Sequence, residues 1–163
     1  MILSSKRLTW FHYVLLFVMG HTGTALAAGP TTVEEATANF YQALNVMFTG
    51  DGGPMKEAWS HADDITYMGP GGNYLVGWRD IEKEWDAQTA RKLGGRVTPT
   101  DLHTTESGDL AVINCIESGE NAVGGKSEVV KIRSSTVFRR EAGIWKVIGH
   151  QTDKLGFLEG DDS

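Results

Sequence analysis

The chain contains very little cysteine: Cys115 is the only one among its 163 residues. A single cysteine cannot form an intramolecular disulfide, so the stability of the fold has to come from a hydrophobic core. Cys115 lies within the apolar run from Leu110 to Ile116, which predicts a buried and unreactive thiol. No Cys/His cluster is present, and His61, Asp63 and Asp64 lack the spacing of a recognised ligand set. The sequence therefore predicts no metal site.

Positive charge is also scarce, because 15 Lys and Arg stand against 21 Asp and Glu, for a formal net charge of −6. An acidic domain repels phosphate backbones and anionic lipid surfaces, which excludes nucleic acid as a partner. The glycine cluster from Gly69 to Gly72 joins two strand patterns and does not open a helix, so it is not a phosphate-binding loop. Nothing resembles the strained turn that carries a nucleophilic serine. We therefore expect no cofactor.

The chain has no long apolar run. A short one belongs to a predicted signal peptide over residues 1–27. Lys6 and Arg7 supply a positive start, residues 14–19 are apolar, and residues 25–27 have the small-x-small pattern of a cleavage site. The apolar run is shorter than the roughly 20 residues of a spanning helix. An uncleaved amphipathic anchor is the alternative. Cleavage would leave one domain, residues 28–163, with a charge of 13 − 21 = −8. We expect it to be periplasmic or secreted, without stable membrane insertion.

The remaining sequence changes from helical to strand patterns along its length. Thr32 and Glu35 have the spacing of a capping box, and apolar residues then recur every three or four positions as far as Met47. Helices are predicted over 33–47, 54–59 and 78–89, with Gly94 as the cap of the third. Strands are predicted over 64–68, 74–76, 96–106, 110–117, 128–140 and 144–152. Helices followed by long antiparallel strands predict an α+β fold, with helices on one face of a curved sheet.

The segment from Ser134 to Asp153 is the most informative part of the chain. It predicts two strands joined by a Glu-Ala-Gly turn, with Trp145 just after the turn and His150 near the far end. It resembles the closing hairpin of the SnoaL-like branch of the nuclear-transport-factor-2 (NTF2-like) superfamily, whose last strand often reads Gly-x-Trp-(Lys/Arg)-(Ile/Val)-x-x-His. The resemblance covers essentially the whole mature chain and implies a cone whose mouth holds a small molecule. It also implies a homodimer formed through the sheet.

The resemblance places a pocket between the helices and the concave face of the sheet. The candidates for lining it are aromatic, although plain core packing is the alternative reading for each. These residues are Phe40, Trp59, Tyr67, Trp78 and Trp85.

Three polar residues are candidates for catalysis: His150, His61 and Asp64. A histidine held by a carboxylate can act as an acid or a base near neutral pH, but it can equally serve as a structural hydrogen-bonding group. In a regular strand His150 would face away from Trp145, whereas a bulge before Gly149 would bring both to one face. The sequence leaves this choice open.

Ketosteroid isomerase is the relative whose chemistry is easiest to compare, because it needs a tyrosine and a protonated aspartate around the enolate oxygen and an aspartate base. In this chain the corresponding positions are Phe40, Thr136 and Gly69. All three groups are missing, which excludes that reaction by that route.

Three functional hypotheses remain, because the superfamily includes enzymes and non-catalytic binding proteins. The favoured one is an exported domain that binds a small, partly apolar molecule. The alternative is an acid/base enzyme (an isomerase, cyclase or hydrolase) in which His150 or His61 works with a nearby carboxylate. The carboxylate candidates are Asp63, Asp64, Glu117 and Asp153. The third is an oligomeric interaction domain with a collapsed pocket.

Overall fold

The computed structural model describes residues 29–159, so the predicted signal peptide lies outside the described residues. Helices α1 (Val33–Met47), α2 (Gly53–Ala58) and α3 (Trp78–Arg91) share the first half with strands β1 (Thr66–Met68) and β2 (Tyr74–Val76). The second half consists of long strands: β3 (Arg96–Ser107), β4 (Leu110–Val123), β5 (Lys126–Glu141) and β6 (Ile144–Thr152). The predicted α+β class is confirmed. Within residues 29–159, no helix is long and apolar enough to cross a membrane.

Helix α1 begins where the sequence predicts it, because the capping box is formed. The Glu35 amide donates to Thr32 Oγ1 at 3.2 Å, and the Thr32 amide donates to Glu35 Oε2 at 3.3 Å. These bonds satisfy two backbone donors that a helix start would otherwise leave unpaired. The buried side of the helix carries Val33, Phe40 and Met47, each no more than 1% exposed. Their spacing aligns one apolar stripe with the sheet below.

Helix α3 buries Ile81 and Trp85, as its apolar spacing predicts, but its end differs from the prediction. The left-handed residue that ends the helix is Lys92 (φ 48°), whose amide donates to the Thr89 carbonyl, and not Gly94. Gly94 is also left-handed (φ 62°), but its amide donates to the Phe48 carbonyl at 2.9 Å. Gly94 therefore ties the connection before β3 to the end of α1.

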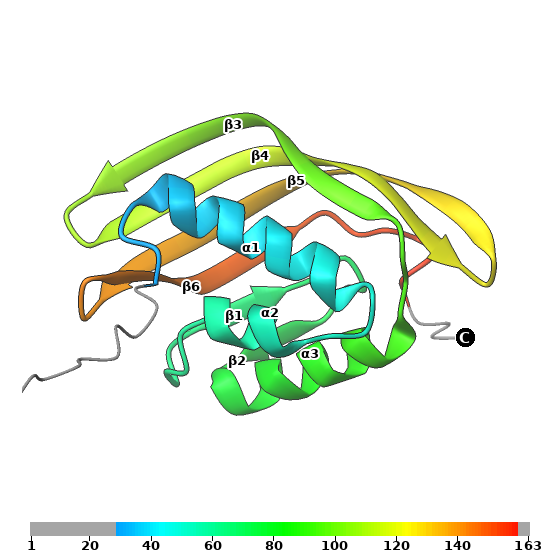
Figure 1. Cartoon of the computed structure of the whole chain (residues 1–163), viewed down its shortest axis with the longest axis horizontal. Helices are drawn as coiled ribbons and strands as arrows, with labels where there is room; N and C mark the ends of the chain where they lie inside the picture. The colour runs from blue at the N-terminus through cyan, green and yellow to red at the C-terminus, as the bar shows by residue number, and fades with distance from the viewer. Residues whose placement is uncertain (1–28, 160–163) are drawn as a thin grey trace, which may run out of the picture.

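The six strands form one curved, unclosed sheet in the order β2-β1-β6-β5-β4-β3. All neighbours are antiparallel except β1 and β6, which run parallel. Figure 1 shows α1 lying along the concave side of the long strands, with α2 and α3 grouped beside β1 and β2. Gly119 allows β3 and β4 to approach closely, because a Cβ there would overlap the Arg96 carbonyl oxygen.

A β-bulge in β6 decides which way the end of that strand faces. Phe138 pairs with Val147 and Val137 pairs with Gly149, so Ile148 is the extra residue on β6. The extra residue shifts the alternation by one position. Trp145, Val147 and His150 are consequently all buried on the inner face.

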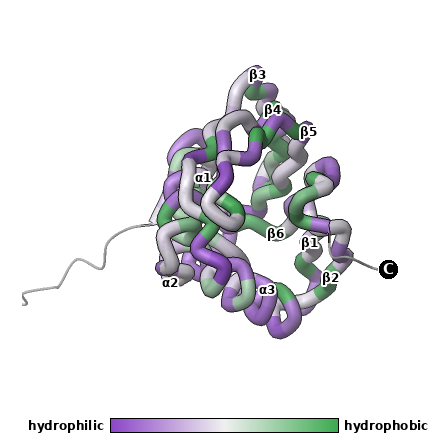
Figure 2. The backbone as a smooth tube through the Cα atoms, turned by 90° about the vertical axis from the view of Figure 1, so that its right-hand side faces the viewer, coloured by the Kyte–Doolittle hydropathy of each residue, from purple (hydrophilic) through white to green (hydrophobic). Residues whose placement is uncertain are grey.

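The core lies between α1, α3 and the concave face of the sheet. Its largest fully buried side chains are aromatic: Trp59, Trp85, Trp145, Phe40 and Phe138. Figure 2 shows hydrophobic residues along β6 in the middle of the molecule, whereas many residues of α3 are hydrophilic. The buried polar side chains, such as Glu117 and His150, are therefore surrounded by apolar packing.

Candidate functional site

A cavity of about 50 Å³ lies inside the cone. That volume holds a few water molecules at most. Residues of the helices, of the sheet and of the segment after β6 line it. They include Phe40, Tyr67, Trp85, Gln88, Glu117, Asn121 and His150.

His150 is held in this cavity by contacts on three sides. Its ring lies 5.0 Å from the Phe40 ring and 6.1 Å from the Tyr67 ring, centroid to centroid, and is nearly parallel to the latter. Its Nδ1 is hydrogen-bonded to the Thr136 hydroxyl at 2.9 Å. The side chain is almost completely buried, and this burial lowers the pKa of His150 to about 4. The imidazole is therefore uncharged at neutral pH.

Glu117 faces the other nitrogen of the same imidazole. Its Oε1 lies 3.6 Å from His150 Nε2, beyond hydrogen-bond distance, and accepts a hydrogen bond of 3.1 Å from the Tyr41 hydroxyl. Glu117 is 4% exposed, and burial raises its pKa to about 7 although the bond from Tyr41 acts in the opposite direction. The Tyr41 oxygen is also 3.0 Å from the Cys115 sulfur. Burial raises the pKa of Tyr41, so it remains a donor.

The two shifts reverse the usual order of pKa values, in which a carboxyl group titrates at a lower pH than an imidazole. Between about pH 4 and pH 7, Glu117 carries a proton while His150 does not. A proton donor and a proton acceptor therefore line one cavity in their reactive forms at the same pH. Environments that separate the pKa values of neighbouring groups are typical of acid/base sites.

An aromatic wall closes the side of the cavity nearest α3. The Tyr67 and Trp85 rings lie 4.6 Å apart, and Trp59 packs against Trp85 at 5.3 Å. The indole N–H groups of Trp59 and Trp85 are buried without a hydrogen-bond partner among the described residues. The Tyr67 hydroxyl accepts a hydrogen bond from Gln88 at 2.9 Å. Of the five predicted pocket residues, Phe40, Tyr67 and Trp85 line the cavity, and Trp59 lies behind them.

His61, Asp64 and Trp78 do not join the cavity. His61 is exposed and stacks on the half-buried Trp78 with 3.9 Å between ring centroids. Asp64 is exposed and forms a two-pronged ion pair with Arg139, at 2.7 and 3.1 Å. Its hydrogen bonds to Arg139 lower the pKa of Asp64. The loop between α2 and β1 therefore directs His61 toward Trp78 at the start of α3 and Asp64 toward Arg139 on β5, away from the cavity.

Glu117 is one of the four carboxylate candidates, and the alternation of residues along β4 distinguishes it from the other three. Ala111, Ile113, Cys115 and Glu117 are all buried and alternate with more exposed residues. A carboxylate in the core-facing phase of a strand is a recognisable exception to the rule that charged side chains stay exposed. Tyr41, by contrast, lies about 100° around the helix from Phe40, and only the sheet beneath it shows what its hydroxyl reaches.

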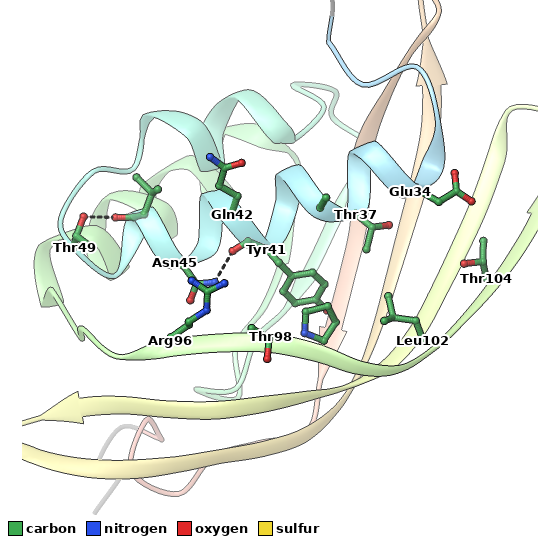
Figure 3. Close-up of a pocket in the computed structure, with 13 residues that line it drawn as sticks. Glu34, Thr37, Tyr41, Gln42, Asn45, Thr49, Arg96, Thr98, Leu102 and Thr104 are labelled. Atoms are coloured by element: carbon green, nitrogen blue, oxygen red, sulfur yellow. Dashed lines mark hydrogen bonds between the residues drawn. The ribbon is translucent and has the colours of Figure 1, made fainter.

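A larger cleft of about 770 Å³ runs along the outside of α1, between that helix and β3. Figure 3 shows Tyr41 projecting from α1 toward β3, between Thr98 and Leu102. Because the Tyr41 hydroxyl bonds to Glu117, its ring separates this cleft from the inner cavity. Within residues 29–159, no group of three or more His, Cys, Asp or Glu side chains is placed to hold a metal ion.

The three positions compared with ketosteroid isomerase have other roles here. Phe40 packs on His150, and Thr136 orients the same ring. A Cβ at Gly69 would overlap the Tyr67 hydroxyl, so a larger side chain at this position would displace the tyrosine. Tyr67 therefore fills the space that the side chain of an aspartate base at position 69 would need.

Residues 33–152 match the family of SnoaL-like domains. The match spans most of the chain, and the protein therefore belongs to the SnoaL-like domain family. No curated protein matches the sequence.

Solved structures of the NTF2-like superfamily share this fold at low sequence identity. One, from Streptomyces avermitilis and suggested to be a dehydratase, is 22% identical with a TM-score of 0.66, over 76% of this chain and 94% of its own. Another, from Shewanella frigidimarina and suggested to be a ketosteroid isomerase, is 19% identical with a TM-score of 0.60, over 72% and 91%. A third, from Pseudomonas putida and of unknown function, is 17% identical with a TM-score of 0.63, over 74% and 82%.

Proposed function

We propose that this SnoaL-like domain binds a small, partly apolar molecule inside the cone and transfers a proton on it. The observation that carries this proposal is the buried pair of His150 and Glu117, which line one cavity as neighbours with 3.6 Å between Nε2 and Oε1. His150 would act as the base through Nε2, the nitrogen that Thr136 leaves free. Glu117 would act as the acid.

The chemistry that this pair supports is proton abstraction next to a carbonyl group. His150 would take a proton from carbon while Glu117 gives its proton to the carbonyl oxygen, which yields an enol, an imidazolium and a carboxylate. The Tyr41 hydroxyl, 3.1 Å from Glu117 Oε1, would stabilise that carboxylate. With a double bond next to the enolised carbon, the imidazolium would return its proton to the far end of the conjugated dienol while Glu117 takes back the enol proton, which completes an isomerisation and restores both groups. In a β-hydroxy ketone the imidazolium would instead protonate the leaving hydroxyl group, so that water departs while Glu117 takes back the enol proton.

Deuterium exchange tests the proposal without knowledge of the natural substrate. The methyl protons of 2-acetonaphthone, an uncharged enolisable ketone, would be followed by NMR in D₂O at pH 6 with the wild-type protein. We expect His150→Gln and Glu117→Gln each to slow the protein-dependent exchange by about 100-fold or more, the usual range for an acid or base group. His61→Gln is the matched control, since that ring lies on the surface, and it should exchange at the wild-type rate. Unaltered exchange in His150→Gln would refute the assignment.

A second candidate, a binding protein without chemistry, is favoured by the mainly apolar lining of the cavity. Retention of the ketone without any exchange would support it. Absence of both binding and exchange would instead support the interaction domain with a collapsed pocket.

We also propose that the chain is exported and that the mature domain forms a homodimer. The order of charged, apolar and small residues in positions 1–27 supports export. The outer face of the sheet supports dimerisation, because helices cover only its concave side (Figure 1).

A further inference from the structure

We propose that the ligand of the inner cavity is an uncharged molecule whose apolar part takes the place of Leu155 and Leu158. This inference rests on the proposed function in using the same cavity, but it concerns binding alone. It follows from the size of the cavity, from the segment that fills its mouth, and from the charges around it.

The cavity is too small for a ligand as it stands. Sites for small organic molecules usually enclose about 300–1,000 Å³, whereas this one measures about 50 Å³. Most of the residues that line it on α1, α3 and the sheet, such as Phe40, Trp85 and Ile132, belong to the tightly packed core and cannot withdraw without disrupting it. Leu155 and Leu158 are different, because they come from the short segment after β6 and are only partly buried.

The C-terminal segment (residues 153–159) is attached by polar contacts and by the packing of Leu155, Phe157 and Leu158 on the core. Asp153 forms an ion pair with Arg133 at 2.8 Å on the exposed side of the sheet. The Leu155 amide donates to the Pro70 carbonyl at 2.9 Å, and the Leu158 amide donates back to the Leu155 carbonyl at 2.9 Å. An exposed ion pair and a few backbone hydrogen bonds contribute little stability. The apolar packing supplies most of what holds the segment in the mouth, and a ligand whose apolar part fills the same space would replace it while β6 stays in the sheet.

The charges around the cavity argue for an uncharged ligand. No Lys or Arg is among its lining residues in the described part of the chain, and the ionisable groups there are Glu117, His150 and Tyr67. Arg91 and Glu84 lie together in an adjoining depression on the side of α3, which shares Gln88 and Leu158 with the cavity but does not bring Arg91 into its lining. A carboxylate or phosphate inside would face Glu117 without a countercharge, and an unpaired buried charge is strongly unfavourable. The unpartnered indole N–H of Trp85 offers a donor for a ligand oxygen.

Equilibrium dialysis at pH 8 with two probes of nearly equal shape tests this proposal: 2-acetonaphthone, which is uncharged, and 2-naphthoate, which is an anion. The full chain without its leader would be used. We expect the ketone to bind at least about 100-fold more tightly than the carboxylate, because the site cannot pair the charge. Equal affinities would overturn the inference that the ligand is uncharged.

Variants of the C-terminal segment test the displacement. The double change Leu155→Ser with Leu158→Ser should strengthen ketone binding by about tenfold or more. Without the two leucines the closed form of the segment is less stable, so a smaller part of the binding free energy is used to open it. Leu110→Ser is the matched control: this leucine is exposed at the start of β4 and does not line the cavity, so the affinity should not change. Leu158→Ser alone replaces the double variant if the latter loses the wild-type circular dichroism spectrum.

The two proposals fail in different ways. Unchanged ketone affinity in the leucine variants, or no ketone binding to any of these proteins, would overturn the inference about the ligand. Tight ketone binding without deuterium exchange would refute proton transfer and leave the inference intact. Exchange together with equal affinity for both probes would refute only the inference.

Discussion

The dependence of stability on pH should reveal Glu117 and His150 separately, because their shifted pKa values act in opposite directions. The pKa of Glu117 rises from 4.5 to about 7 on folding, so the folded state holds its proton where the unfolded state releases it. This contribution is fully present below pH 4.5 and is lost as the pH rises to 7. The pKa of His150 falls from 6.5 to about 4, so the unfolded state binds the extra proton. Its contribution is fully present above pH 6.5 and is lost as the pH falls to 4.

Each shift corresponds to about 3 kcal/mol, from roughly 1.4 kcal/mol per pKa unit. In the wild-type protein the two effects nearly cancel between pH 4.5 and pH 6.5. Glu117→Gln should remove one of them, so its free energy of unfolding relative to wild type should rise by about 3 kcal/mol from pH 4.5 to pH 7.5. His150→Gln should gain a similar amount relative to wild type as the pH falls from 7 to 4.

Urea denaturation followed by far-UV circular dichroism, at half-unit steps from pH 4 to pH 8, would measure both differences. Ion-paired surface carboxylates such as Asp64 and Asp153 also affect the absolute curve, but they are present in every variant and cancel in the differences. A Glu117→Gln curve parallel to that of the wild type would show that Glu117 titrates normally, and the proposed acid would be lost with it.

Three further predictions concern packing, assembly and processing. Trp85→Ala should lower the free energy of unfolding by about 3–5 kcal/mol, because the ring is fully buried between Trp59 and Tyr67. Trp78→Ala, at a half-buried position, should shift the urea midpoint much less. Equal shifts of the midpoint in the two variants would contradict this packing. The mature domain should dimerise through the outer face of the sheet around Lys131 in a salt-sensitive manner, and light scattering that shows only monomer at high micromolar concentration and low salt would exclude this. The exported protein should lack residues 1–27, and an intact mass that includes them would refute cleavage.

Much of the fold could be predicted from the sequence because its signals are local. The capping box at Thr32 and Glu35, the apolar stripe of α1 and the alternation in the long strands each depend on residues close together in the chain. The parallel pairing of β1 with β6 has no such signal, because it joins segments about 80 residues apart. The same holds for the left-handed residue after α3, where the contact between Gly94 and Phe48 decides the turn.

For the candidate site, the sequence by itself determined which groups were available, and the tertiary structure decided which of them meet. His150, Glu117 and the aromatic residues could be named from residue type and from the family resemblance. The direction of His150 depends on a bulge at Ile148, which arises from the pairing of β6 with β5 and has no signal of its own in the sequence. Its partner Glu117 lies 33 residues earlier on a strand that is not adjacent to β6. Burial by the whole core then shifts both pKa values, and burial is a property that no local pattern contains.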